Sequence, residues 1–242
     1  MLEAGFWGFV GGAALLVGAL IGLGVRTGQR TIGLVMAFGA GVLISALAFE
    51  LTEESFRRGG TVGLALGLAA GGLSFFAGDW LLDHRGANHR KRSGGEQEDG
   101  SPGAIVLGSL MDGIPESVAI GVSLLGGGGV GVATVAAVFL SNVPESLSAA
   151  TGLRKAGHSP AWILGLWTAI ALASAVAAAL GYALLGDASP ALVGFIQAFA
   201  AGAILTMLAD TMMPESFQHG GKLVGLATLL GFALAFLLSS AE

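Results

Sequence analysis

Five long runs of uncharged, mostly apolar residues constrain this chain more than any other feature of its sequence. They lie near residues 4–25, 60–78, 161–186, 188–209 and 223–240. About 20 consecutive apolar residues are enough for an α-helix to cross the hydrocarbon core of a bilayer. Runs of that length, repeated along the chain, predict an integral membrane protein whose backbone polar groups are satisfied within helices.

Three further segments have the same length and apolarity but contain acidic residues: 31–56, 103–125 and 129–153. We therefore predict an all-α integral membrane protein with eight transmembrane helices, forming a single transmembrane domain over residues 1–242. The helices are expected near residues 4–25, 31–56, 60–82, 103–125, 129–153, 159–186, 188–216 and 221–240.

The composition supports a membrane protein and excludes several other classes. Only 11% of the residues are charged, against about 25% in a soluble domain. No basic patch is large enough to follow a phosphate backbone, so nucleic acid is not an expected partner. The 42 glycines suit closely packed membrane helices. The small-residue face formed by Gly8, Gly11, Gly12, Gly18 and Gly22 could pack within the chain or against a second copy, which leaves a homodimer open.

The distribution of basic residues predicts the topology. With the N-terminus outside the cell, nine Lys and Arg residues fall on the cytoplasmic side and only Arg57 and Arg58 fall outside, as the positive-inside rule requires. Both termini are then extracytoplasmic in a multi-pass protein of the cell membrane. The loop 83–102 is cytoplasmic and contains the basic run at residues 90–92. Its composition favours a solvated linker.

The chain contains two internal repeats. Residues 37–41 recur at 198–202, and at the same shift of 161 residues 54–56 recur at 215–217. Helices two and three therefore resemble helices seven and eight, and the predicted topology makes the copies run in opposite directions, as in many secondary transporters. A second repeat relates residues 112–117 to 141–146. The predicted arrangement is three helices, two, and then three, with inverted repeats.

Helices four and five contain carboxylates that are costly in a membrane. A charged side chain at a helix centre costs about 2.5 to 3.5 kcal/mol, and Asp112, Glu116 and Glu145 are such residues. Asp112 and Glu116 are four residues apart and share one face of a helix. Asn142 and Ser141 form a similar polar stripe with Glu145.

Each of these stripes includes a proline, which removes a backbone N–H and displaces a carbonyl one turn earlier. Carboxylate, amide and carbonyl oxygens are the ligands of hard divalent cations. The stripes therefore favour a cation path. The alternative remains that the prolines only bend the helices, and that the acids are protonated or paired with one another.

Further acids lie near the outer ends of helices two and seven. They are Glu50, Glu54, Asp210 and Glu215. They fit two interpretations, a secondary site for ion access or gating, or a marker of the water interface.

The Pro-Glu motifs, the helix pattern and the loop resemble the Zrt-, Irt-like (ZIP) family of divalent metal transporters. Helix four of that family commonly reads His-Asn-x-Pro-Glu-Gly, where this chain has Asp-Gly-Ile-Pro-Glu-Ser at 112–117. Helix five of the family has a polar pair, one residue, Pro and Glu, which matches 141–145. The resemblance implies that Asp112, Glu116, Asn142 and Glu145 are the metal ligands.

The resemblance implies a secondary transporter that moves a divalent cation into the cytoplasm by alternating access. Zn²⁺ is the first expectation, with Mn²⁺ or Fe²⁺ as alternatives because Asp112 replaces a histidine. The partners would be divalent cations and the lipid bilayer, with no prosthetic group. No enzymatic activity is expected, because the Gly-x-Gly-Asp signature of intramembrane proteases is absent from the sequence. A metal sensor or degenerate paralogue that does not transport is the alternative.

Overall fold

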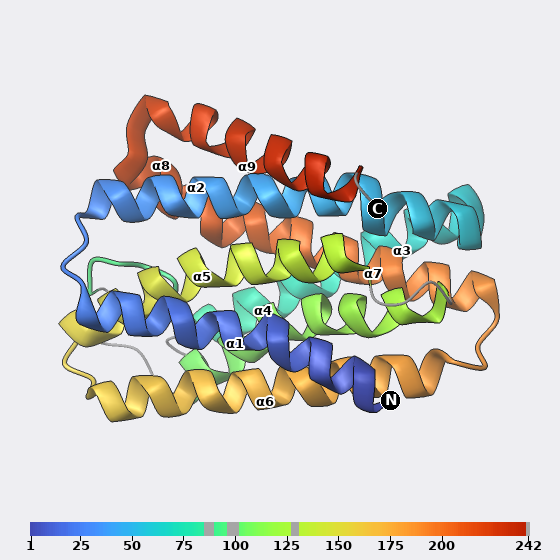
Figure 1. Cartoon of the computed structure of the whole chain (residues 1–242), viewed down its shortest axis with the longest axis horizontal. Helices are drawn as coiled ribbons and strands as arrows, with labels where there is room; N and C mark the ends of the chain where they lie inside the picture. The colour runs from blue at the N-terminus through green and yellow to red at the C-terminus, as the bar shows by residue number, and fades with distance from the viewer. Residues whose placement is uncertain (85–89, 96–101, 127–130, 241–242) are drawn as a thin grey trace.

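The structure is a computed structural model, and it describes residues 1–84, 90–95, 102–126 and 131–240. Every element in these ranges is helical (Figure 1). The elements are α1 (Leu2–Gly24), α2 (Gln29–Ala46), η1 (Leu47–Leu51), α3 (Thr52–Leu82), α4 (Pro102–Ser123), η3 (Leu124–Gly126), α5 (Val132–Lys155), α6 (Pro160–Leu185), α7 (Pro190–Met207), η4 (Leu208–Met212), α8 (Met213–Gly220), η5 (Gly221–Leu223) and α9 (Val224–Ser239).

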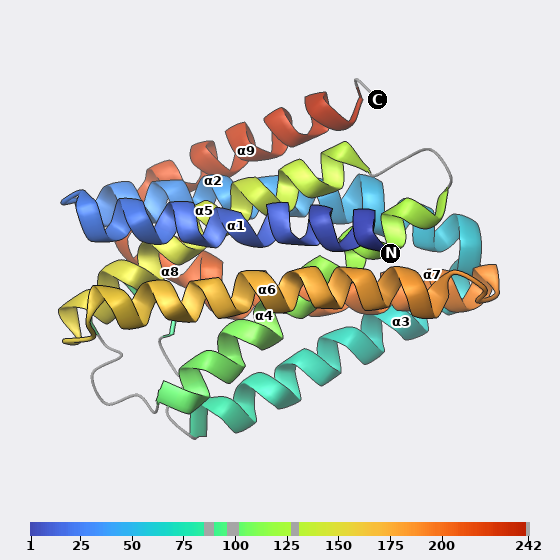
Figure 2. The same cartoon turned by 60° about the horizontal axis from the view of Figure 1, so that its bottom comes forward.

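Six helical stretches of the described chain are long and apolar enough to cross a membrane, which defines a multi-pass membrane protein. Two of them, Gln29–Leu82 and Pro190–Ser239, contain 54 and 50 residues. A straight helix of either length would be about 75 to 80 Å long, far more than the hydrocarbon thickness of about 30 Å. Each stretch is broken at a glycine with left-handed φ, Gly60 at 64° and Gly221 at 62°. Figure 2 shows α3 returning along the bundle from the end that α2 reaches.

The repeat seen in the sequence has a counterpart in the backbone. The wide turn η1 (Leu47–Leu51) and the wide turn η4 (Leu208–Met212) are both π-helical, and they are related by the same shift as the sequence repeat. The left-handed glycines Gly60 and Gly221 obey that shift too. In Figure 1, α2 and α7 run in opposite directions along the bundle. Equivalent residues therefore adopt equivalent backbone conformations in two oppositely directed copies.

The two copies pack against each other, because the first helix of each copy packs against the second helix of the other. Helix α2 packs against α9, and α7 packs against α3. Glycines make these contacts close: a Cβ atom on Gly231 would overlap the carbonyl of Phe38, and one on Gly71 would overlap that of Phe199. Phe38 and Phe199 are equivalent under the repeat. The same backbone-to-backbone approach thus occurs once in each half of the bundle.

Helix α1 lies between α5 and α6, and its glycines lie at both contacts. A Cβ on Gly12 would lie 2.9 Å from the Cα of Ala171 in α6. A Cβ on Gly18 would overlap the Val143 carbonyl and the Ser146 hydroxyl in α5. The small-residue face predicted from the sequence is therefore used within the chain, where it holds α1 against the helix that contains Glu145.

Candidate functional site

The three predicted carboxylates are all buried inside helices. Asp112 and Glu116 belong to α4, Glu145 belongs to α5, and their exposed fractions are 2%, 1% and 4%. Pro115 and Pro144 lie within the same two helices. The acids are therefore held in the interior of their helices, and an uncompensated charge is most costly near the centre of a membrane-spanning helix.

Asp112 is paired with an arginine from the segment that follows α3. Nε of Arg90 donates to Oδ2 of Asp112, and Nη2 donates to Oδ1, both at 2.9 Å. Nη2 also lies 2.6 Å from Oδ1 of Asp79, near the end of α3. A bidentate arginine and carboxylate pair is among the strongest hydrogen-bonded ion pairs. Burial acts to lower the pKa of Arg90, but Asp112 and Asp79 together hold that pKa above its ordinary value.

The next residue, Lys91, joins the two helices of the predicted site. Its Nζ atom lies 3.1 Å from Oε1 of Glu145 and 3.3 Å from Oδ2 of Asp112. A single ammonium group thus neutralises carboxylates from α4 and α5 at once. Carboxylates from the two duplicated motifs, Asp112 and Glu145, therefore lie around one positive charge.

Ser93 binds the same segment to Glu215 of α8. The backbone N–H and the hydroxyl of Ser93 both donate to Oε1 of Glu215, at 2.9 and 2.7 Å. Ser148 of α5 donates to the Lys91 carbonyl at 2.6 Å, and Lys155 donates to the Ser93 carbonyl at 2.7 Å. The segment of residues 90–93, which we call the basic segment, is therefore bound to the bundle by its backbone as well as by its side chains.

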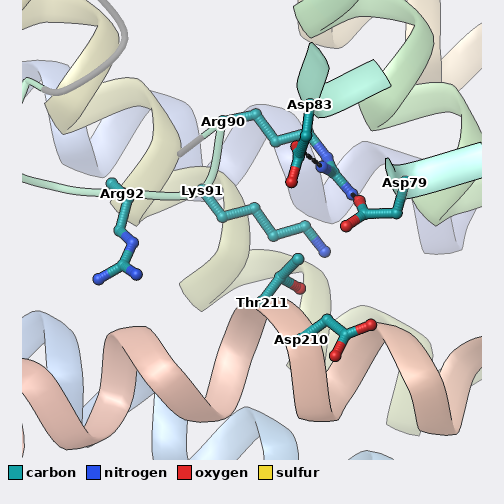
Figure 3. A pocket seen from close by; sticks show the side chains of 7 residues that line it. All are labelled: Asp79, Asp83, Arg90, Lys91, Arg92, Asp210 and Thr211. Atoms are coloured by element: carbon teal, nitrogen blue, oxygen red, sulfur yellow. Dashed lines mark ion pairs between the residues drawn. The ribbon is translucent and has the colours of Figure 1, made fainter. Parts of the chain in front are cut away.

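A cavity of about 170 Å³ lies beside the basic segment (Figure 3). Acidic side chains from α3 and η4 face basic side chains of the segment across it (Figure 3). The lining residues are Asp79, Asp83, Arg90, Lys91, Arg92, Asp210 and Thr211. All seven lining residues are polar, and one of them, Arg90, also pairs with Asp112.

The basic run is not a solvated linker, and this part of the sequence interpretation is wrong. Arg90 and Lys91 are only 3% and 4% exposed. The composition of the loop predicted that these residues are exposed to solvent, because a run of three basic residues in a polar loop normally has no counter-charge nearby. Here buried carboxylates supply that counter-charge. The rest of the predicted loop, at 85–89 and 96–101, lies outside the described residues.

The predicted ligand Asn142 and the possible secondary residue Ser141 both make hydrogen bonds to backbone carbonyls. Nδ2 of Asn142 donates to the carbonyl of Gly11 in α1 at 3.1 Å, and the hydroxyl of Ser141 donates to the Val138 carbonyl at 2.9 Å. The serines that follow the two Pro-Glu pairs also bond locally, Ser117 to the Gly113 carbonyl and Ser146 to the Asn142 carbonyl. The structure therefore brings Asp112 and Glu145 together, whereas Nδ2 of Asn142 and the serine hydroxyls are hydrogen-bonded to helix backbones.

Among the described residues, no three His, Asp or Glu side chains are arranged as a metal cluster. The reason is visible in the ion pairs, since basic side chains separate the acids. Oε1 of Glu116, deeply buried, has no hydrogen-bond partner in the described part of the chain. Chemically, the site holds positive charge between α4 and α5 and keeps one carboxylate oxygen available.

The four accessory acids lie at two opposite ends of the bundle rather than together. Glu50 of η1 accepts a hydrogen bond from Ser239, and Glu54 pairs with Arg58 at 2.6 Å. Asp210 and Glu215 lie beside the basic segment. Because the second copy of the repeat runs in the opposite direction (Figure 1), the ends of α2 and α7 that contain these acids face opposite ends of the bundle, so the four acids do not all lie on one side.

The sequence interpretation missed several residues of the site. They are Asp79, Arg90, Lys91, Ser93 and Ser148. One signal was available: three acids buried in a membrane need positive charge nearby, and 90–92 is the longest basic run in the chain. The partner serines gave no signal of this kind, because serine is common throughout membrane helices.

The fold and the site define a multi-pass helical membrane protein with an ion-paired carboxylate centre. No family model matches the chain. The chain is 30% identical to zinc transporter ZIPB of Bordetella bronchiseptica over 252 aligned residues, covering 97% of this chain and 79% of that protein. It is 26% identical to a candidate zinc transporter of Arabidopsis thaliana over 210 residues, covering 86% of this chain. The chain spans about a third of the length of that plant protein. By its similarity to the bacterial transporter, the chain belongs to the ZIP family.

Proposed function

We propose that the protein is a secondary transporter that moves a divalent metal cation across the cell membrane into the cytoplasm. The observation that carries this proposal is the pairing of Asp112 and Glu145 around one buried positive charge, the ammonium of Lys91. Carboxylates from two helices that neutralise an ammonium can also neutralise a metal ion. The names of the relatives, both zinc transporters, support Zn²⁺ as the first candidate cargo, with Mn²⁺ or Fe²⁺ as alternatives.

The ligands that we propose are Asp112, Glu116, Glu145 and the amide oxygen of Asn142. Glu116 has an oxygen without a hydrogen-bond partner in the described chain, so it can bind a cation without losing another contact. The Nδ2 atom of Asn142 is engaged with Gly11, which leaves its Oδ1 as the ligand atom. This all-oxygen set suits hard cations and is also accepted by Zn²⁺.

For the topology we propose eight crossings in a 3+2+3 arrangement with both termini extracytoplasmic. The breaks at Gly60 and Gly221 would divide each of the two longest helical stretches into two crossings. Glu50 would then lie at the extracytoplasmic end and Asp210 at the cytoplasmic end, each within a π-helical turn. Alternating access would expose the carboxylate centre to each end in turn.

Metal flux into proteoliposomes tests the proposal. We expect Glu116→Ala and Glu145→Ala to abolish saturable uptake of Zn²⁺ and Mn²⁺. Glu53→Ala is the matched control, because Glu53 is an exposed glutamate whose ion pair, with the exposed Arg57 at 2.5 Å, lies outside the carboxylate centre. Uptake by both site variants at the rate of the control would place the transport path elsewhere.

A second candidate is a metal sensor that binds without transport. It is favoured by the same ion pairs, because Arg90 and Lys91 occupy the carboxylate centre and so obstruct a path for ions between α4 and α5. Equilibrium metal binding by the purified protein, without saturable flux in proteoliposomes, would identify the sensor. Saturable flux would exclude it.

A further inference from the structure

The basic segment brings the charge of one divalent cation into the carboxylate centre. Arg90 and Lys91 each carry one positive charge, and both are buried against the acids proposed as metal ligands. A buried carboxylate without a counter-charge is strongly disfavoured. Two tethered cations therefore satisfy the electrostatic demand that a single M²⁺ ion would otherwise satisfy.

We propose that the basic segment is a built-in competitor of the transported metal, one that closes the centre from the side of α8 and must leave before metal binds. This inference rests on the proposed function, since it assigns regulation to the same carboxylates. The segment acts as an autoinhibitory substrate mimic.

The contacts make joint occupancy by metal and segment impossible at Asp112. Arg90 takes both oxygens of this carboxylate, and Lys91 approaches Oδ2 as well. A metal ion bound to either oxygen would lie within hydrogen-bond distance of a cationic nitrogen. At such separations the repulsion between like charges in a buried site is large. Metal binding at Asp112 therefore requires Arg90 and Lys91 to withdraw.

Helix α4 is shaped to receive the segment. A Cβ atom at Gly108, one turn before Asp112, would lie 2.6 Å from Cδ of Arg90. The missing side chain opens the groove in which the arginine lies. The hydrogen bonds from Ser93 to Glu215 and from Ser148 to the Lys91 carbonyl then set the depth of the segment. The fit includes backbone and side-chain contacts on four helices, α3, α4, α5 and α8, which a chance collapse of a polar loop would not provide.

Release of the segment is also possible within the fold. Its contacts are hydrogen bonds and ion pairs, and an adjacent polar cavity of about 170 Å³ already separates it from η4. When a segment and a ligand compete, the apparent dissociation constant of the ligand rises by the inverse of the fraction of protein in the released state. The basic segment would thus set the metal concentration at which transport begins.

Equilibrium binding of Zn²⁺ and of Mn²⁺ to the purified full chain in nanodiscs tests the competition. We expect Arg90→Gln/Lys91→Gln to bind metal with an affinity higher by about tenfold or more, which corresponds to a segment docked in at least about nine-tenths of the molecules. The matched control is Arg26→Gln/Arg30→Gln, which removes two exposed basic residues and should bind like the parent chain. Equal affinities of the two double variants would overturn the proposal.

Trypsin provides a second measurement on the unaltered chain, because residues 90–92 are themselves cleavage sites. We expect slow cleavage there without metal and faster cleavage as Zn²⁺ or Mn²⁺ saturates the protein. Cleavage at the exposed Arg26, followed by mass spectrometry in the same sample, is the internal control for protease activity. Cleavage at residues 90–92 that metal leaves unchanged relative to Arg26 would overturn the proposal.

The outcomes separate this inference from the proposed function. If the parent chain binds metal through Glu116 and Glu145 but the basic segment has no effect on affinity, the site stands and the competitor does not. If neither the parent nor Arg90→Gln/Lys91→Gln binds Zn²⁺ or Mn²⁺, the proposed site itself is refuted, and the competition with it.

Discussion

Arg90 binds both oxygens of Asp112 although the two residues belong to different segments of the chain, 22 positions apart. The pair is almost completely buried, with each side chain 2% exposed. It joins the part of the chain between α3 and α4 to the middle of α4. A polar loop residue and a membrane-embedded acid thus form one electrostatic unit.

We expect the Arg90 and Asp112 pair to show strong coupling in a double-mutant cycle. Removing one partner of a buried ion pair costs about 3 to 5 kcal/mol because the other charge is left uncompensated. Arg90→Gln and Asp112→Asn should each lower the unfolding temperature in detergent, and the double variant should be more stable than the sum of the single effects predicts. Additive effects would contradict a direct pair.

The paired glycines Gly60 and Gly221 should be equally intolerant of a side chain. Both combine a positive φ with an extended ψ, a conformation almost restricted to glycine, and alanine there costs about 1 to 3 kcal/mol. Gly60→Ala and Gly221→Ala should therefore lower the unfolding temperature by similar amounts. Gly63→Ala is the control, because that site is helical with no atom within 4 Å of an added Cβ, and alanine should be neutral or stabilising there. Very unequal effects of the first two variants would argue against equivalent turns.

Replacing the acid at position 112 should change metal preference. Asp112→His adds a nitrogen ligand, which Zn²⁺ favours over Mn²⁺. We expect the ratio of Zn²⁺ to Mn²⁺ affinities to rise by about tenfold, equivalent to about 1.4 kcal/mol. Competition binding measures this ratio, with the exposed residue in Asp187→His as the control. An unchanged ratio would show that position 112 does not touch the metal.

Glu215 should keep the basic segment docked. It accepts two hydrogen bonds from Ser93 and lies 3.5 Å from Nη1 of Arg92. Glu215→Gln removes the charge and weakens these bonds, which are worth about 1.5 to 3 kcal/mol when the acceptor is ionised. Tryptic cleavage at residues 90–92 should then accelerate about tenfold in metal-free protein. Cleavage at the parental rate would assign the docking to Arg90 and Lys91 alone.

Much of the helical framework could be predicted from sequence because it depends on local properties. The apolar runs predicted where helices lie, and the repeat predicted that helices two and three resemble helices seven and eight, although it gave no sign of the π-helical turns at 47–51 and 208–212. The burial of Asp112, Glu116 and Glu145 followed from their helix positions. These features need no knowledge of which helices touch.

The remaining features depend on contacts between distant segments, which the sequence does not encode in any short pattern. Asn142 donates to Gly11 because α1 approaches α5 closely at its glycines. Arg90 is buried because Gly108 leaves room beside Asp112. Each outcome depends on the absence of a side chain on a partner helix, and such absences become meaningful only once the packing is known.

The exchange of partners between the two copies also dictates an order of biosynthesis. Helix α2 packs against α9 through the approach of Phe38 to Gly231. During translation α2 leaves the ribosome well before α9 does, because α3 to α8 lie between them in the chain. The glycine-lined surface of α2 must therefore stay without this partner until α9 has been made. A nascent chain that stops before α9 would leave that surface exposed, so this contact forms only after α3 to α8 have been synthesised.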